Sequence, residues 1–345
     1  MKLKKKSIIL LSVLLIVLLA VGYLGFAIRN SLFSGFNIEK TTYIYIDEKK
    51  DYNKLLQDLQ NTAKIENLAA FKRVSSFYDY PKLMKTGRYA VTPSTTVQEL
   101  VHILKGGHQT PVNLKFNNIR TKKDFAVRIS DQLMITKDQL LAALNDSNSC
   151  RELGFTPETI SSMFIPNTYQ FYWDISLQSF LKRMKKEYDN FWTADRLSKA
   201  KELGLTAVEV STLASIVEEE CTYSDEYSTV AGLYLNRLKK GQLLQADPTV
   251  KFAVGNFGLR RILFEHLKTN SPYNTYKYRG LPPGPIRIPS IKGIDAVLSP
   301  KAHDYLFMCA KEDFSGRHNF AKTHAEHSVN AAKYRIALNK RGIYK

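Results

Sequence analysis

An uncharged run of 22 residues, Ser7 to Ile28, limits the fold of this chain more than any other feature. About 20 consecutive apolar residues in a helix cross the hydrocarbon core of a bilayer. Because the basic flank of a membrane helix stays in the cytoplasm, Lys2, Lys4, Lys5 and Lys6 predict a cytoplasmic tail at residues 1–6. We therefore predict a single-pass helix at residues 7–28 in the cell (inner) membrane, with the remainder extracytoplasmic. A signal peptide cleaved after Ala20-Val-Gly22 is the alternative, although the apolar region of such peptides is usually about 7–15 residues.

The charge balance restricts the partners of the exported part. The formal net charge is +18, and +14 remains (18 minus 4) when the four cytoplasmic lysines are set aside. Such a surface attracts anionic partners over a long range. Because an exported chain rarely meets nucleic acid, we predict no nucleic-acid partner and expect an acidic cell-wall polymer or an anionic lipid face.

The cysteines do not indicate a disulfide framework or a metal site. Cys150, Cys221 and Cys309 lie far apart and lack metal-ligand spacing. An odd number argues against complete pairing. One bridge between two of them and buried free thiols are equally compatible with the sequence.

Changes of pattern divide the exported part into two domains, as its length suggests. After a linker at residues 29–40, a small α/β module is predicted at residues 41–110. Its expected elements are a strand (Thr42–Ile46), two helices (Tyr52–Leu59 and Ile65–Phe71), a strand (Gly87–Val91) and a helix (Val97–Leu104) ended by Gly106-Gly107.

Residues 111–345 predict a larger domain of mixed α+β class. Its first expected elements are a strand at Val112–Phe116 and helices at Phe125–Leu133, Lys137–Leu144 and Ser176–Trp192. The chain as a whole is therefore predicted to be α+β, with one transmembrane helix.

A helix predicted from Ala207 carries the residue that says most about function. Thr206 and Glu209 fit a capping box at its start. Each helical residue turns by about 100°, which places Glu220 on one apolar stripe with Leu213, Ile216 and Val217. Burial would raise the pKa of this carboxyl, and an acid that keeps its proton near neutral pH can act as a general acid. The alternative is that Glu220 sits at a frayed helix end and reaches water.

The two preceding glutamates project away from this stripe. Glu218 and Glu219 are most simply a solvated face of the helix. Because Glu218 lies one turn before Thr222, it also remains a candidate supporting carboxylate in the same cleft.

Short polar motifs follow Glu220 and supply candidate binding residues. The first of them are Asn236, Arg237, Gln245, Asp247 and Thr249. A helix end and surface charge would also explain Asn236 and Arg237, which close the helix predicted at Ser224–Lys240. Asp247 before Pro248 could be an N-cap, whereas Gln245 and Thr249 have no obvious local duty.

The remaining candidates lie in two later segments. Tyr273, Asn274 and Tyr276 precede the stiff loop Gly280-Leu-Pro-Pro-Gly-Pro-Ile286, and exposed rings and amides on such a loop suit sugar binding. His318 and Phe320 form the second pair. The spacing of His318, His324 and His327 could indicate a metal, but the supporting ligands and a zincin motif are missing, so we predict neither a metal nor a cofactor.

These motifs, in this order, resemble the MltG/YceG-like endolytic murein transglycosylases from about Phe164 onward. The segments that carry the resemblance are Phe164-Ile-Pro-Asn-Thr-Tyr169, Ala214-Ser-Ile-Val-Glu-Glu-Glu220, Asn236-Arg237, Leu244-Gln-Ala-Asp-Pro-Thr249, Tyr273-Asn-Thr-Tyr276, Gly280–Ile286 and Gly316-Arg-His-Asn-Phe320. The anchor, and Gly87-Arg-Tyr89 with its following helix, resemble the membrane span and LysM-like module of that family. Two segments depart from it: Asn117-Asn118 replaces an expected Glu-Gly pair, and Arg287-Ile-Pro-Ser290 replaces a more usual Asn-Pro-Gly.

The resemblance implies an enzyme, a lyase that cuts peptidoglycan within its glycan strands. Glu220 would be the general acid and base, and the bond between N-acetylmuramic acid and N-acetylglucosamine would end as a 1,6-anhydro ring. The other candidates above would bind the sugars. The resemblance also implies a role in terminating nascent strands, with wall-synthesis enzymes as partners.

Two other classes stay open at this point. A non-catalytic wall-binding protein would bind glycan without cutting it, although the intact Glu220 argues against this. An anchored hydrolase would need a second carboxylate opposite Glu220, and Asp247 or Glu218 could serve.

Overall fold

The computed structural model describes residues 2–259 and 261–342, which have the mixed α+β fold predicted from the sequence. The chain divides into two compact units. Unit 1 runs to Asn113 and takes in Gln132–Met134 and Gln170–Ile175, whereas unit 2 comprises Leu114–Asp131, Ile135–Tyr169 and Ser176 onward. The domain limits inferred from the sequence, 41–110 and 111–345, are not tested by this division and remain a prediction.

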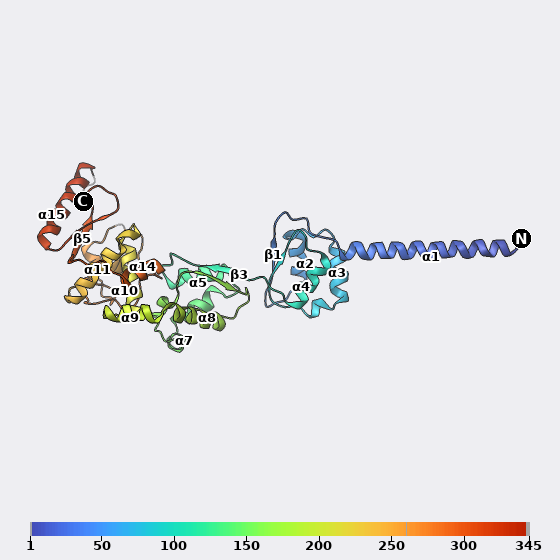
Figure 1. Ribbon diagram of the computed structural model, residues 1–345, viewed down its shortest axis with the longest axis horizontal. Coiled ribbons are helices and arrows are strands. Elements are labelled where there is room, and N and C mark those ends of the chain that lie inside the picture. The colour runs from blue at the N-terminus through green and yellow to red at the C-terminus, as the bar shows by residue number, and fades with distance from the viewer. Residues whose placement is uncertain (1, 260, 343–345) are drawn as a thin grey trace. The chain divides into compact units, whose positions relative to one another are not determined.

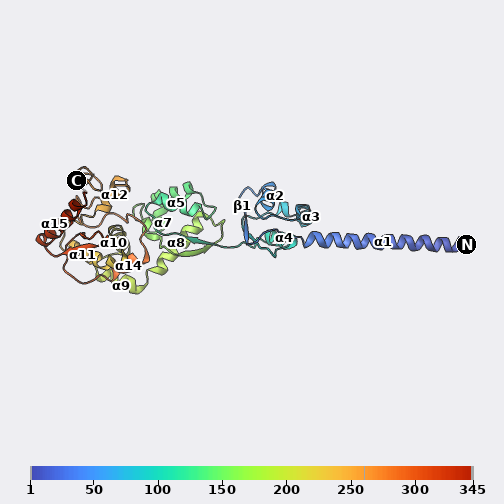
Figure 2. The ribbon, with the colours of Figure 1, turned by 90° about the horizontal axis from the view of Figure 1, so that it is seen from above.

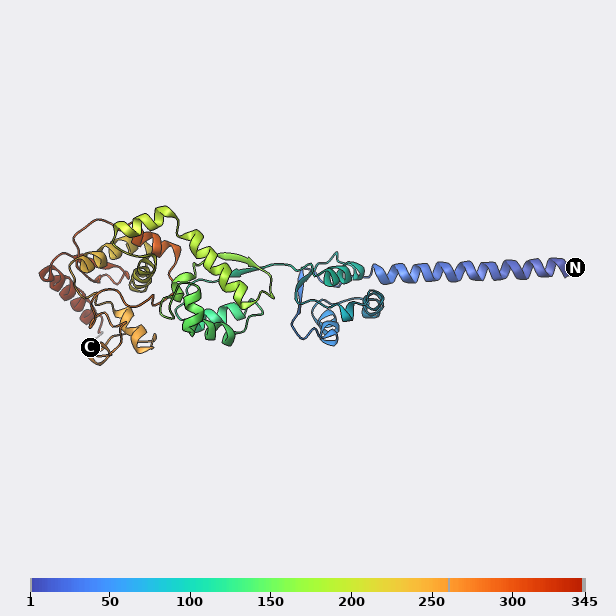
Figure 3. The same ribbon diagram turned by 90° about the horizontal axis from the view of Figure 1, so that it is seen from below.

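The first helix, α1 (Lys2–Leu32), is continuous in all three ribbon views (Figures 1, 2 and 3). Its part Ser7–Leu32 has a mean hydropathy of 2.9 over its most apolar window, none of which is buried. At about 1.5 Å per residue, this part is long enough to cross a bilayer. The helix is therefore consistent with a single-pass anchor.

The rest of unit 1 follows the predicted order of strand, two helices, strand and helix. Its elements are β1 (Thr42–Ile46), α2 (Tyr52–Asn61), α3 (Leu68–Phe77), the 3-10 turn η1 (Tyr80–Lys82), β2 (Gly87–Val91) and α4 (Val97–Gly106). β1 and β2 pair antiparallel, with Ile44 opposite Tyr89. α3 begins three residues later than predicted because Asn67 caps it through the backbone N–H of Ala70.

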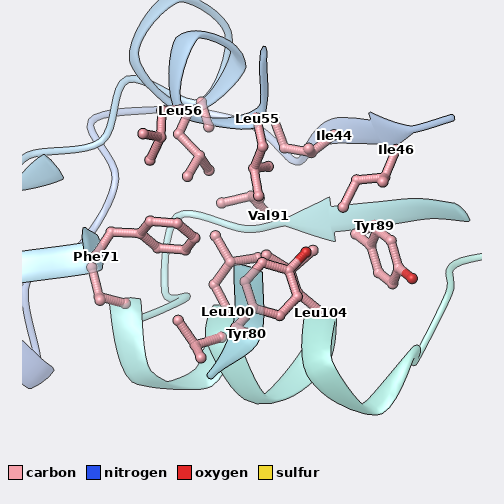
Figure 4. Packing of buried hydrophobic residues seen from close by; sticks show 14 of the residues in the cluster. Ile44, Ile46, Leu55, Leu56, Phe71, Tyr80, Tyr89, Val91, Leu100 and Leu104 are labelled. Carbon is pink, nitrogen blue, oxygen red and sulfur yellow. The ribbon is translucent and has the colours of Figure 1, made fainter. Parts of the chain in front are cut away.

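The core of unit 1 lies between its two-stranded sheet and its helices (Figure 4). Alternate strand residues and the apolar faces of the helices meet there, which is the arrangement that their periods of 2 and 3.6 residues dictate. Ile44, Tyr89, Leu100 and Leu104 are each no more than 1% exposed.

Unit 2 is mainly helical. Strands β3 (Val112–Lys115) and β4 (Thr168–Phe171) pair with each other, and each contains residues assigned to both units. Its first elements are α5 (Lys122–Ser130), α6 (Lys137–Asn145), α7 (Ser147–Glu152), η2 (Ile160–Met163), α8 (Leu177–Phe191) and α9 (Ala194–Glu202). Its later elements are α10 (Ala207–Glu220), η3 (Ser224–Glu226), α11 (Tyr227–Lys239), α12 (Asp247–Val254), α13 (Phe264–Leu267), α14 (Ile291–Leu298), β5 (Phe307–Ala310), β6 (His318–Ala321) and α15 (His324–Lys340).

Local chemistry explains where these helices begin. Ser176 caps α8 and Thr206 forms the predicted capping box on α10, so both starts are confirmed. The predicted start of α5 at Phe125 is wrong, because Thr121 and Asp124 form a capping box three residues earlier. Similarly, a 3-10 turn takes up the first three residues of the helix predicted from Ser224.

Helix α10 lies at the centre of the later part of unit 2, beside α11 and α14 (Figures 1 and 2). Every residue from Val210 to Glu218 is buried, so the helix is enclosed on all sides and not only along one apolar stripe. Its hydroxyl groups are satisfied within the helix, since Ser211 and Thr212 donate to the carbonyls of Ala207 and Val208. α10 thus provides a rigid base for Glu220 at its last position.

The three cysteines are free thiols in this fold. Cys150 and Cys221 are buried and Cys309 is half-buried. Of the two alternatives compatible with the sequence, the structure has the one without a bridge.

Candidate active site

Glu220, the last residue of α10, lines a polar cavity of about 270 Å³. α10 and α11 form one side of this cavity, and the segment from Gln245 to Asp247 forms another. The lining residues are Glu220, Leu233, Tyr234, Arg237, Gln245, Asp247, Tyr276, Met308, Cys309, Ala310 and His318. Five of the predicted binding residues (Arg237, Gln245, Asp247, Tyr276 and His318) therefore share one cavity with Glu220.

Glu220 is half-buried, and its carboxyl group accepts a 2.8 Å hydrogen bond from the hydroxyl of Tyr234. Burial raises the pKa of Glu220 to about 7, the Tyr234 bond lowers it, and the nearby Asp247 raises it further. Loss of hydration penalises the ionised form more than one hydrogen bond can stabilise it. This carboxyl group can therefore carry a proton near neutral pH.

Asp247 faces the cavity and does not cap α12, so the capping interpretation is wrong. Ala246 occupies the N-cap position without a side-chain bond, and Asp247 is the first helical residue. The Asp247 carboxylate instead accepts a 2.6 Å hydrogen bond from the hydroxyl of Tyr276. Burial and this bond raise the pKa of Tyr276 well above its ordinary value, so the phenol stays a donor.

Gln245 owes its position to an unusual backbone conformation. Its φ of +50° lies in the left-handed region, which a residue other than glycine rarely adopts. The backbone N–H groups of Gln245 and Ala246 bond the carbonyl and hydroxyl of Thr275, which hold the segment in place. Such strain is found where surrounding contacts over-determine the backbone, often at functional sites.

Three predicted binding residues have structural hydrogen bonds and do not line the cavity. The hydroxyl of Thr249 donates to the Ala246 carbonyl and contacts that of Thr275. The Asn236 amide donates to the carbonyls of His303 and Tyr305. The expectation that Asn274 is exposed is wrong, because it is fully buried and donates to the carbonyls of Leu267 and Thr269.

The other two predicted binding residues also lie outside this cavity. The ring of Phe320 stacks on Tyr305, with 5.6 Å between centroids. Tyr273 lines a second cavity with Phe252, with 4.6 Å between their ring centroids. Phe320 is therefore part of the packing around β6, and Tyr273 belongs to the second cavity.

His318 reaches the cavity from β6 and is held by a buried acid. The Glu226 carboxylate accepts from the backbone N–H of His318 at 3.0 Å and lies 3.1 Å from its ring Nδ1. His324 and His327 begin α15 and lie against Phe307. Among the described residues, no three His, Cys, Asp or Glu side chains are grouped as metal ligands would be.

Glu218 and Glu219 form a buried ion network, so the prediction of a solvated face is wrong. The Glu218 carboxylate accepts from the backbone N–H and the hydroxyl of Ser290, and the Arg287 Nε lies 3.5 Å from it. Glu219 pairs with Arg287 at 2.9 Å and with Arg120 at 2.8 Å. Glu218 thus points away from the Glu220 cavity.

This network includes residues from the two segments in which the sequence departs from the family that it resembles. The Arg287 guanidinium also donates to the Asn118 side chain at 2.6 Å, and Asn118 has a φ of +51°. Asparagine tolerates this left-handed conformation better than most residues other than glycine. Gly293 leaves room for Glu218, since a Cβ there would lie 2.2 Å from its carboxylate oxygen. Together these contacts hold the last turn of α10 and hence Glu220.

Sequence reasoning missed Tyr234, Glu226, Arg120 and Arg287. Tyr234 lies within an apolar Leu-Tyr-Leu stretch of α11, and its position 14 residues after Glu220 carries no local signal of contact. Arg120 and Arg287 lie 99 and 68 positions from Glu219. In the sequence, only a polar side chain at a helix position expected to be buried could have indicated that such distant partners exist.

Comparison with known proteins places these residues in a wider context. The YceG-like family model matches residues 44–333. A Bacillus subtilis (strain 168) protein named endolytic murein transglycosylase is 34% identical over 231 residues, which cover 63% of each chain. A Streptococcus pneumoniae (strain D39) protein of the same name is 26% identical over 365 residues, which cover 96% of this chain and 65% of that protein.

The chain thus spans less than two thirds of the length of these curated relatives. A crystal structure of a YceG-like protein from Listeria monocytogenes is similar in fold, with a TM-score of 0.56 and 26% identity. That similarity covers 85% of this chain and 99% of the other.

Proposed function

The chain belongs to the YceG-like family, and from that premise we propose that it is a membrane-anchored endolytic lytic transglycosylase of peptidoglycan. The observation that carries the proposal is Glu220, a half-buried carboxyl in a polar cavity whose pKa is raised to about 7. One such group can serve as both acid and base in this reaction.

The reaction needs one proton to move in each direction. Protonated Glu220 gives its proton to the glycosidic oxygen between N-acetylmuramic acid and N-acetylglucosamine as the bond breaks through an oxocarbenium-like state. The resulting carboxylate then takes the proton of the muramic C6 hydroxyl, which attacks C1 and closes the 1,6-anhydro ring. Because this attack is intramolecular, its effective concentration is high and no activated water is required.

The other residues of the cavity would orient the sugars. Arg237 is fixed by bonds from its guanidinium to the carbonyls of Leu306 and Leu244, each at 2.6 Å. It is therefore a rigid donor beside the acid, and we assign sugar binding to it with Gln245, Asp247, Tyr276 and His318. Asn236, Thr249, Asn274 and Phe320 are assigned positioning roles, and Tyr273 lies in the second cavity. Glu218 is assigned to the ion network.

A hydrolase is the second candidate, and the position of Asp247 is the observation that favours it. This carboxylate lines the same cavity as Glu220 and is exposed, so it could activate a water. The products would then carry one additional water and reducing ends.

The anchor and the small module extend the proposal to location. Helix α1 would hold the enzyme in the cell (inner) membrane with residues 1–6 in the cytoplasm, so that cuts fall near newly made strands and terminate their elongation. Strands β1 and β2 pair antiparallel, and two helices lie between them in the chain. This arrangement supports a LysM-like module at residues 41–110. Wall-synthesis enzymes would be its partners there.

The test is digestion of purified peptidoglycan by the full chain in detergent, followed by mass spectrometry. Internal fragments that end in anhydro-muramic acid are the expected products. Products heavier by one water would support the hydrolase instead. Binding to the strands without any cleavage would support a wall-binding protein and would overturn the proposed activity.

The pH dependence of cleavage should follow the protonation of Glu220. Because the acid must be protonated before the bond breaks, kcat/KM should fall by about tenfold per pH unit above about pH 7. Initial rates between pH 5 and 9 measure this. Replacement of Tyr234 by Phe removes a bond that lowers the pKa of Glu220, and the fall should then begin at higher pH. A profile that is the same in both proteins would argue that Glu220 is not the titrating group.

A further inference from the structure

A second cavity of unit 2, about 540 Å³ in volume, shares no lining residue with the Glu220 cavity. Three cationic side chains, Arg120, Lys122 and Lys123, line one part of it. The rings of Phe252, Phe257 and Tyr273 line another part. One carboxylate, Glu158, also belongs to the lining, and Arg120 is already paired with Glu219, so Lys122 and Lys123 supply the cationic charge that a ligand would meet.

The aromatic wall is a packed unit. Phe252 lies between Tyr273 and Phe257, with ring centroids 4.6 and 6.2 Å away. The Arg120 guanidinium carbon lies 5.0 Å from the centre of the Phe257 ring. Such a surface accepts apolar stems and backbone planes of a ligand while the nearby cations attract its charge.

Backbone carbonyls hold Lys122, one of the cationic residues, in place. The Lys122 ammonium donates to the carbonyls of Leu144 and Pro157 at 3.2 and 3.1 Å. Burial lowers the pKa of Lys122, so an anion in the cavity would stabilise its charged form. Lys123 is exposed at the start of α5, and Glu158 accepts a 2.7 Å bond from the Thr156 hydroxyl.

The two cavities lie on the same structural elements. Asp247 in the first and Phe252 in the second are five residues apart on α12, about 7.5 Å along the helix axis. Likewise, Tyr276 lines the first cavity and Tyr273 the second. Five residues also turn the helix by about 140°, so the cavities lie on different sides of α12, and a stem of three or four residues, about 10–13 Å when extended, is what would connect them.

We propose that this cavity binds the acidic peptide stem carried by the muramic acid residues of the glycan strand. Its cations would bind the stem carboxylates, Glu158 would bind an amino group of the stem, and the rings would pack on the peptide. The inference rests on the proposed function. Through the second cavity, the enzyme would prefer strands that bear peptides to bare strands.

The test compares one preparation of glycan strands before and after an amidase removes the stems. Lys123→Glu reverses one charge at an exposed position near a helix start, where an acid is compatible with the fold. We expect kcat/KM on stem-bearing strands to fall about three- to tenfold, since one exposed pair is lost and a repulsion is added. The rate on bare strands should not change. Lys186→Glu, an exposed change on α8 outside the cavity, should match the parent on both substrates.

A second measurement does not depend on catalysis. Calorimetric titration of the free stem peptide into the full chain in detergent should show binding that Lys123→Glu weakens and Lys186→Glu does not. Equal loss on both kinds of strand would mean that the cavity contacts sugars, and the absence of peptide binding would overturn the proposal. If no strand is cut but the peptide still binds, the proposed activity fails while this site stands.

Discussion

Replacement of Glu220 by Gln is expected to lower the rate of glycan cleavage by about 1,000-fold or more, the usual size of a lost general acid. The amide has the same shape and can still accept the hydrogen bond of Tyr234, so the cavity should keep its geometry. It can neither give nor take the proton that the reaction moves. Release of anhydro-ended fragments, followed by mass spectrometry over time, measures the effect.

The control for this variant is Glu202→Gln, at an exposed position of α9. It makes the same chemical change away from the cavity and should leave the rate unaltered. A Glu220→Gln protein that cuts within tenfold of the parent rate would exclude Glu220 as the acid.

The Glu220→Gln protein should become more stable than the parent as the pH rises. A carboxyl whose pKa is about 7 in the fold and 4.5 when unfolded binds more protons in the folded state, so stability falls between these values. The free energy lost is about 3 kcal/mol once the pH exceeds 7. Glu220→Gln avoids this loss, so its unfolding temperature should exceed that of the parent at pH 8 and match it at pH 4.

Replacement of Arg287 by Ala is expected to destabilise unit 2 by about 3–5 kcal/mol, the cost of leaving a buried ion pair without one partner. Arg287 contacts both Glu218 and Glu219, whose side chains are only 4% and 16% exposed. Without it, two carboxylates beside Glu220 lose a counter-charge in a region with little water. Urea unfolding followed by near-ultraviolet circular dichroism measures the free energy.

The matched control is Arg183→Ala, which removes an exposed pair with Glu187 on α8 and should cost less than about 1 kcal/mol. A second change, Glu218→Gln, should restore part of the stability lost in the Arg287→Ala protein, because Glu218 is then left without a counter-charge whereas Glu219 keeps Arg120. Similar losses for the two arginine variants would contradict the buried network.

Local features of the fold could be predicted from neighbouring residues. The order of strands and helices in unit 1, the caps at Ser176 and Thr206, and the apolar run of α1 each depend on side chains within one or two helical turns. The position of Glu220 among apolar residues belongs to this group, since helical periodicity alone placed it there.

Errors arose where a local rule competed with a distant contact. Asp247 has the sequence of an N-cap, but the Tyr276 hydroxyl, 29 residues away, binds its carboxylate. Asn274 looked like an exposed sugar-binding amide, but it is buried and its amide donates to the backbone carbonyls of Leu267 and Thr269. In both cases the surroundings of the side chain decided its role, and its neighbours in the sequence did not.

The sequence by itself determined that α1 is apolar and long enough to cross a bilayer, the class of the fold, and a carboxyl that helical geometry placed among apolar residues. All of these follow from short-range periodicity and residue chemistry. Only the tertiary structure decided that Glu218 and Glu219 pair with Arg120 and Arg287, that Tyr234 bonds Glu220, and that two cavities share α12. Such contacts join residues far apart in the chain, and their energy depends on the burial that folding itself creates.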